Sequence, residues 1–247
     1  MMKPRKQNGR LHIPPGGGAA GTPFPGFDVA GPDKWTYDWD EKTRRLVQER
    51  VEHVPVYRFF AENEAVLLEA LCECILPQQD RAATDRVPIA PWIDQRLYEG
   101  KTAGYRYETM PDDRQAYRLG LQGFNQTAER LFGKQFIDLE AKQQGEILEQ
   151  VSNGSPPGEA WKDLPAREFF QVLVNNIISE YYAHPAAWAE IGFNGPSSPR
   201  GHIRLKLDQR DDWEAEEVQP YSSVEIVRRR LQSGKASGGE AKGGPTH

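Results

Sequence analysis

Cysteine is scarce in this sequence, and long apolar runs are missing. The two cysteines, Cys72 and Cys74, are two positions apart in a helical pattern, where their side chains point in different directions. We therefore expect buried thiols, because C-x-C by itself supplies at most half a zinc site. No stretch of about eighteen apolar residues exists, so we expect no direct membrane insertion.

The sequence also has no excess of basic residues. The chain carries 31 Lys and Arg against 36 Asp and Glu, a formal net charge of −5, and no Lys/Arg block dominates. Nucleic-acid binding requires a basic surface, so this composition argues against it. The mean hydropathy of −0.72 fits a soluble globular domain with polar ends.

The motifs of the common enzyme classes are absent from the sequence. The run Gly16-Gly17-Gly18 follows prolines and not a strand, so it fails the context of a dinucleotide-binding loop. There is no Walker loop, no nucleophile elbow and no H-E-x-x-H pair of metal ligands. We therefore expect that this chain holds no cofactor and has no catalytic residue of its own.

What the sequence does contain is helical periodicity. Apolar residues recur at threes and fours in the segments 40–54, 62–76, 92–99, 111–132, 138–151 and 163–183. In the first segment we expect Leu46, Val47, Val51 and Val54 to face inward, and in the second Val66 joins the apolar stripe. Period-two alternation is not sustained, so the predicted fold class is all-α, a single irregular helical domain.

Capping patterns predict where several of these helices begin and end. Gly133 is expected to end the segment 111–132 in a left-handed conformation, and Asp138 and Asp163 are expected to cap the two helices that follow. His184 precedes a proline and is therefore pushed towards extended geometry, which ends the last long helix near residue 183. Pro185 then opens a second, short helix.

Composition divides the chain into four parts. We expect a disordered Gly/Pro-rich N-terminal arm at 1–34, a helical domain at 35–207, an acidic segment with a short helix at 208–231, and a disordered tail at 232–247. Trp35, Tyr37 and Trp39 alternate just after the arm. Such an extended aromatic segment packs either on a partner or on the body of the chain itself, and solitary exposed aromatics favour the second.

The densest motif of the chain is HPAAWAEIGFNGPSSPRG, residues 184–201. Glycine or proline stands at Gly192, Gly195, Pro196, Pro199 and Gly201, which predicts an irregular loop whose path is fixed by backbone constraints. A loop of this kind typically shapes a surface that another molecule contacts.

Together with the aromatic pair Tyr181-Tyr182 before it, this motif resembles the C-terminal signature of the gluconate 2-dehydrogenase subunit 3 family. Looser matches occur upstream in the same order, at Phe59-Phe60, Ile75-Leu76-Pro77, Ile93-Asp94, Phe132-Gly133 and Phe169-Phe170. The resemblance covers residues 59–201 and leaves both ends of the chain outside it.

The resemblance implies a non-catalytic accessory subunit of a flavin-dependent dehydrogenase. Its partner would be a large subunit of the glucose–methanol–choline type, which holds FAD and oxidises a sugar, glycoside or sugar acid. A cytochrome subunit or another acceptor would take the electrons. The small subunit would assist folding, maturation or export of the large one.

The resemblance also draws attention to export, because small subunits of this family often carry a twin-arginine signal. Thr43-Arg44-Arg45-Leu46-Val47 is superficially similar to one, but charged residues follow it and no apolar segment does. We expect no export signal in this chain. Two locations stay open: the cytoplasm, or the periplasm by co-export with a signal-bearing partner.

Aromatic and arginine side chains in this region favour a protein interface. The candidate interface residues are His184, Trp188, Phe193, Asn194, Gly195, Pro196 and Arg200. We expect Tyr181 and Trp188 to lie mainly in the core, and Phe193, Asn194 and Arg200 to be the stronger interface candidates.

The alternative function is a metal-dependent enzyme centred on His184 and His202. Together with Glu180 and Glu190 these histidines offer two imidazoles and two carboxylates around one helix–loop junction, a reasonable ligand set for a metal ion. Their spacing matches no standard metal-binding pattern, and a histidine before proline more often bonds backbone groups at a helix end.

Overall fold

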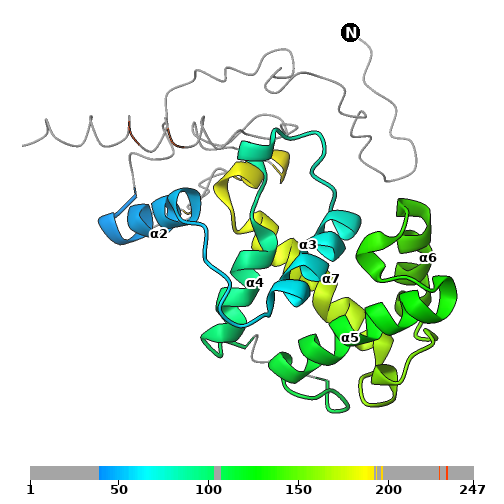
Figure 1. Ribbon diagram of the computed structural model, residues 1–247. Coiled ribbons are helices and arrows are strands. Elements are labelled where there is room, and N and C mark those ends of the chain that lie inside the picture. Colours follow the sequence, from blue (N-terminus) through cyan, green and yellow to red (C-terminus); the bar gives the residue numbers. More distant parts are fainter. Residues whose placement is uncertain are drawn as a thin grey trace, which may run out of the picture.

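A computed structural model describes residues 39–102, 107–191, 193, 196, 228 and 232. These residues form six α-helices and four short 3-10 helices (Figure 1). The α-helices are α2 (Glu41–Glu52), α3 (Glu62–Ile75), α4 (Ile89–Tyr98), α5 (Asp113–Phe132), α6 (Ala141–Ser152) and α7 (Ala166–Tyr182). The 3-10 helices are η1 (Ala83–Asp85), η2 (Phe136–Asp138), η3 (Ala160–Lys162) and η4 (Pro185–Ile191). Because this part of the chain contains no strand, the all-α prediction is confirmed for it.

The long helix α5 forms where capping and periodicity agree. The Asp112 side chain accepts a hydrogen bond from the Gln115 N–H at 3.1 Å, and Gly133 ends the helix at a φ of 68°. Tyr117, Leu121 and Phe124, which recur at threes and fours in the predicted segment 111–132, are all buried. Here the sequence-based boundaries are confirmed at both ends.

Two helices, α3 and α7, form the centre of the body, since each of them packs against α4, α5 and α6. Close approach of α5 to α7 depends on Gly120, because a Cβ at that position would lie 2.1 Å from the Phe169 ring. Tyr117 joins Phe60 to Phe169 through ring contacts at 5.9 and 5.7 Å between centroids. The core is therefore aromatic where these helices meet.

Asp94 on α4 fixes the chain segment that leads into α3. Its carboxylate is fully buried and accepts hydrogen bonds from the backbone N–H groups of Arg58, Phe59 and Phe60, at 2.8, 3.0 and 2.8 Å. A buried carboxylate needs such donors, because burial without them is costly. This arrangement explains how a charged residue is accommodated beside Ile93 in the core.

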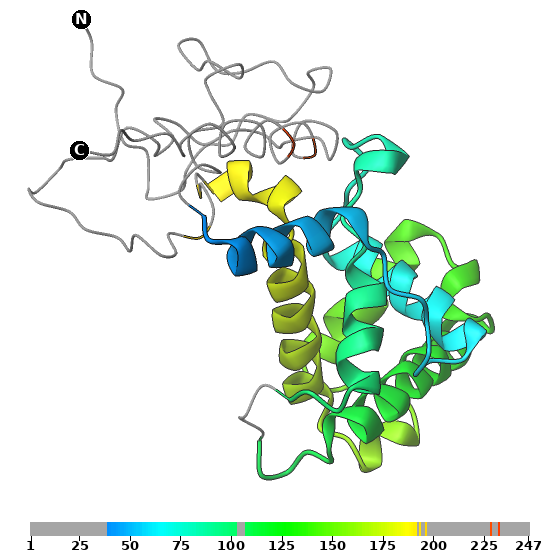
Figure 2. The ribbon, with the colours of Figure 1, turned by 90° about the vertical axis from the view of Figure 1, so that its left-hand side faces the viewer.

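The position of α2 differs from the prediction in one respect. Val47 and Val51 are buried as expected, but Leu46 and Val54 are 58% and 56% exposed. For Leu46 the reason is that α2 lies on the outside of the body, across α7 and α4 and next to η4 (Figure 2), and so buries only a narrow face. Val54 follows the end of α2 at Glu52, because the helix stops two residues before the end of the predicted segment. Val66 on α3, predicted to be part of the apolar stripe, is likewise 43% exposed.

Two predicted helix caps are also wrong. Asp138 lies in η2, and α6 is instead capped by Glu140, whose backbone N–H donates to the Gln143 side chain at 3.2 Å. At the start of α7, Pro165 and not Asp163 occupies the cap position, and no side chain caps the helix there. In both cases the predicted cap belongs to the end of a short 3-10 helix that precedes the α-helix: Asp138 is the last residue of η2, and Asp163 directly follows η3.

The predicted disordered ends, the acidic segment and most of the loop after η4 lie outside the described residues. Within the part of the chain that the structure describes, no helix combines the length and apolar character needed to span a membrane.

Candidate protein-docking site

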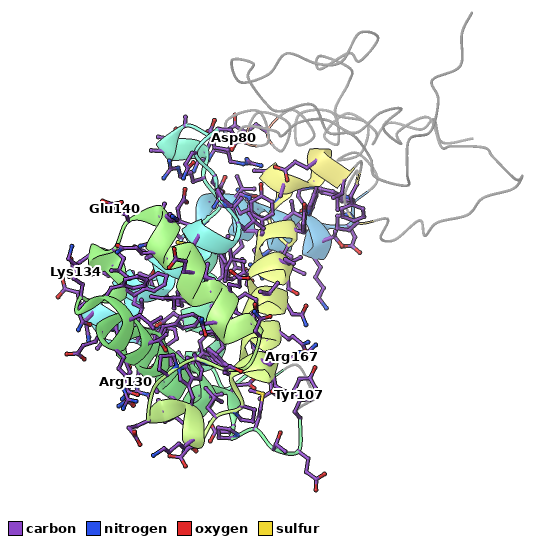
Figure 3. All side chains as sticks on the ribbon, turned by 90° about the vertical axis from the view of Figure 1, so that its right-hand side faces the viewer. Asp80, Tyr107, Arg130, Lys134, Glu140 and Arg167 are labelled. Carbon is purple, nitrogen blue, oxygen red and sulfur yellow. The ribbon has the colours of Figure 1, made fainter. Side chains whose placement is uncertain are left out.

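The candidate residues gather where α7 ends and η4 begins. The helix α7 stops at Tyr182, close to the predicted residue 183, and Pro185 opens η4, as the proline spacing predicted. The junction contacts α2 on one side, and the loop between α3 and α4 reaches it through Arg81. The labelled Asp80, next to Arg81, marks this loop near η4 in Figure 3.

Arg81 is the centre of a buried polar cluster at this junction. Its side chain is 1% exposed and pairs with Glu190 at 2.5 Å. The same Nη2 donates to the Tyr181 hydroxyl at 3.1 Å and to the Ala186 carbonyl at 3.2 Å. A single guanidinium therefore ties the end of α7 to both turns of η4.

Tyr181 and Glu190 complete this cluster. The Tyr181 hydroxyl donates to the Glu190 carboxylate at 2.6 Å. Burial raises the pKa of Glu190, while the hydrogen bond from Tyr181 and the charge of Arg81 oppose that shift. Burial also raises the pKa of Tyr181, and the bond to Glu190 adds to it, so the phenol stays protonated. The arrangement holds a neutral phenol between two paired charges.

A second charged cluster joins α2 to the body. Arg50 donates to Glu180 on α7 at 2.9 Å, and its guanidinium lies 3.9 Å from the centroid of the Trp92 ring on α4. Arg96, one turn after Trp92, approaches the same Glu180 carboxylate at 4.0 Å and Asp113 at 3.8 Å. Stacking on an aromatic face and pairing with a carboxylate suit the planar guanidinium.

His184 lies beneath α2 and is 2% exposed. Its Nδ1 accepts a hydrogen bond from the Ala186 N–H at 3.2 Å. Burial, together with the positive charges of Arg50 and Arg81, lowers the pKa of His184 to about 4, against the effect of a hydrogen bond with the Arg50 backbone. The imidazole is therefore neutral near pH 7 and bonds backbone groups at the helix end.

Three aromatic rings pack edge to face in a row that ends at the surface. Trp39 packs edge-on against Trp188 at 6.3 Å between centroids, and Trp188 packs against Phe193 at 5.2 Å. Trp39 also donates from Nε1 to the Pro196 carbonyl at 2.5 Å. Trp39 and Trp188 are buried, as is Tyr181, whereas Phe193 is 39% exposed. Of the alternatives for Trp39, packing on the chain's own body is therefore the one observed.

The seven candidate interface residues differ in their burial, and three of them lie outside the described residues. His184 and Trp188 lie inside the chain, Pro196 is half-buried, and Phe193 is exposed. Asn194, Gly195 and Arg200 lie outside the described residues. The structure contains no partner chain, so the prediction of an interface stays a prediction, with Phe193 as its exposed member.

The carboxylates proposed as metal ligands are occupied by arginines. Glu180 bonds Arg50 and Glu190 bonds Arg81, so the two carboxylates belong to separate ion-paired clusters. Within the described ranges, no group of three or more His, Cys, Asp or Glu side chains could hold a metal ion. His202 lies outside those ranges. The described residues thus give the metal hypothesis no support.

Sequence reasoning missed the role of Arg81. The loop between α3 and α4 is polar in sequence, and nothing in it predicts a buried arginine. No periodic pattern links Arg81 to Glu190 across 109 positions. Arg50 likewise stands in a run of charged residues, and the sequence around it does not indicate its ion pair with Glu180. Each of these arginines follows polar or charged residues in the sequence, so no local signal separates it from an exposed arginine.

The comparisons with known proteins place this chain in a family. No curated protein and no solved structure matches it. The model of the family described as gluconate 2-dehydrogenase subunit 3 matches residues 62–195, more than half of the 247-residue chain. The match contains Arg81, Asp94 and the α7–η4 junction, while α2 and Trp39 precede it. The chain belongs to the gluconate 2-dehydrogenase subunit 3 family.

Proposed function

We propose that this protein is a non-catalytic accessory subunit of a flavin-dependent dehydrogenase that oxidises a sugar, glycoside or sugar acid. Its partner is a large subunit of the glucose–methanol–choline type, which holds the FAD and carries out the oxidation. The small subunit assists folding, maturation or export of that partner. Membership of the subunit 3 family is the observation that carries this proposal, since the family name itself describes one subunit of a dehydrogenase.

The end of η4 is the part of the surface that we propose contacts the large subunit. Ile191 and Phe193 are 51% and 39% exposed, and a single residue separates them in the sequence. Phe193 rests on Trp188, and its N–H donates to the Trp188 carbonyl at 2.9 Å. An exposed aromatic on a buried, rigid support suits an interface anchor, because little conformational freedom is lost on binding.

The buried ion pair at the α7–η4 junction supports the proposal that the end of η4 contacts the large subunit. The Arg81–Glu190 pair and the Tyr181 hydroxyl fix η4 to α7 just before Ile191. A buried ion pair contributes little net stability compared with apolar packing, so its benefit is a defined geometry. Here the geometry that it defines is the path of the chain that presents Ile191 and Phe193.

The test is co-expression with a large FAD-binding subunit of the glucose–methanol–choline type, followed by affinity capture through the small subunit. If Phe193 is an anchor, Phe193→Ala weakens binding by about 2 kcal/mol, or roughly 30-fold. Ile137→Ala is the matched control, since Ile137 is 46% exposed on η2. Its sequence neighbours Lys134 and Glu140 lie away from η4 in Figure 3.

Two further measurements complete this experiment. The purified small subunit alone is expected to show no flavin absorbance, whereas the captured complex shows the visible absorbance bands of FAD. The Phe193→Ala variant is expected to melt close to the wild-type temperature, because its side chain is partly exposed. Failure of the wild-type chain to capture any flavoprotein, or stoichiometric flavin in the chain alone, would contradict the proposal.

A further inference from the structure

The segment of the chain that precedes the family match covers part of the matched region. Trp39 packs on Trp188, and α2 contacts η4. Arg50 of α2 covers Trp92 and bonds Glu180. We call the covered surface the α2 seat; it consists of Trp92, Glu180, His184 and Trp188. All four residues lie within 62–195, whereas the helix on top of them does not.

Among the contacts that hold α2 on this seat, three come from one face of the helix. Of its twelve residues, Val47 and Val51 are buried, and Arg50 supplies the ion pair with Glu180. These three positions follow the i, i+3, i+4 spacing of one helix face. Figure 2 shows α2 lying on the outside of α7 and α4, next to η4. Peptide helices that bind to other proteins use the same i, i+3, i+4 spacing of contact residues.

The fit between α2 and its seat leaves polar groups unpaired. The Trp92 Nε1–H and the Arg96 Nη2 are buried, and the residues that the structure describes offer them no acceptor. Both belong to α4, one turn apart, beside Glu180. Unpaired buried donors are unfavourable. A helix that brought a carboxylate or carbonyl to this end of the seat would match it better than α2 does.

We infer that the α2 seat is a helix-docking groove that α2 occupies within its own chain and yields to a helix of the large subunit. That helix carries two aliphatic residues four positions apart, with an arginine directly before the second, as Val47, Arg50 and Val51 do in α2. It also carries an acceptor for the Trp92 and Arg96 donors. The identity of the partner rests on the proposed function. The groove itself does not, and it is continuous with Phe193 through the Trp188 ring.

The first experiment tests whether the seat binds a helix in trans. A fluorescent peptide of residues 39–54 is titrated into the full-length chain and into an opened full-length variant, Val47→Asp/Arg50→Ala. The opened variant is expected to bind at least about tenfold more tightly, because its own α2 no longer competes. The same peptide with Arg50→Ala should lose this binding. A peptide with Arg45→Ala should keep it, since Arg45 is exposed.

Binding of the peptide should also raise the melting temperature of the opened variant. If the double variant does not fold, the single variant Arg50→Gln takes its place. A folded, helical variant that binds the native and the Arg50→Ala peptides equally, or neither of them, would overturn the assignment of the seat as a docking groove.

The second experiment tests the occupant. In affinity capture, the opened variant is expected to retain several times more large subunit than the wild type, whereas the Arg45→Ala chain retains the wild-type amount. Equal or reduced capture by an opened variant that still binds the peptide would overturn the role of the large subunit at the seat. If neither chain captures a flavoprotein, the proposed function fails, and the peptide titration alone then decides on the groove.

Discussion

Arg81 and Glu190 form an ion pair at 2.5 Å although 109 positions separate them in the sequence. The arginine side chain is 1% exposed and that of the glutamate 19%. Their contact joins the loop between α3 and α4 to the last turn of η4, on the same face as Tyr181. The stretch of chain just before Phe193 is therefore fixed by a residue from the first half of the molecule.

Arg81→Ala is expected to destabilise the protein by about 3 kcal/mol. The substitution leaves the Glu190 carboxylate and the Ala186 carbonyl without their buried partner, and an uncompensated buried charge is unfavourable. Removing both charges in Arg81→Met/Glu190→Gln should be less destabilising than the single change. Chemical denaturation of the two variants measures the difference. A double variant that is less stable than Arg81→Ala would contradict this account.

The protein is expected to become less stable as the pH is lowered from 6.5 to 4, because of the buried His184. Its pKa is about 4 in the folded chain and about 6.5 in the unfolded chain, so below pH 6.5 the unfolded state binds a proton that the folded state does not. The free energy of unfolding is therefore unaffected by this group above pH 6.5 and declines as the pH falls towards 4. The full loss is about 3 kcal/mol.

The measurement for His184 is the pH dependence of unfolding in the wild type and in His184→Gln. The difference between the two curves isolates the histidine from the carboxylates that also titrate in this range. His53→Gln serves as the control, because His53 is exposed. A wild-type curve parallel to that of His184→Gln between pH 6.5 and 4 would refute the burial argument.

Asp94→Asn should be among the more damaging substitutions in the fold. The carboxylate is 0% exposed and accepts three backbone N–H bonds, and the Asn amide would turn an NH₂ group towards some of these donors. We expect a loss of about 3 kcal/mol in unfolding free energy. Hydrogen exchange should speed up at the Phe60 N–H. The exposed Glu99→Gln is the control, and it should leave both quantities nearly unchanged.

Gly120→Ala and Gly145→Ala are expected to have opposite effects. A Cβ at Gly120 would lie 2.1 Å from the Phe169 ring, which forces α5 and α7 apart and costs about 2–3 kcal/mol. A Cβ at Gly145 meets no atom within 4 Å, so alanine in α6 should add about 0.5–1 kcal/mol through helix propensity. Thermal melts compare them. Equal effects of the two changes would reject the close packing of α5 on α7.

The sequence by itself determined the helices and the family. Local rules place the start and end of α5, the end of α7 before His184-Pro185 and the opening of η4, because caps, glycine and proline act within a few residues. The motif after His184 carried the resemblance that the family match bears out. It also marked Tyr181 and Trp188 as core residues, which their burial confirms.

Tertiary structure alone decided which charged residues are inside and which apolar residues are outside. Leu46 fits an inward face by spacing, but α2 meets the body along one narrow edge and leaves it exposed. Arg81 lies in a polar loop, yet the return of the chain at η4 buries it beside Glu190. Periodicity describes one helix at a time, whereas burial depends on the neighbour that packs against it. That neighbour can come from a hundred residues away.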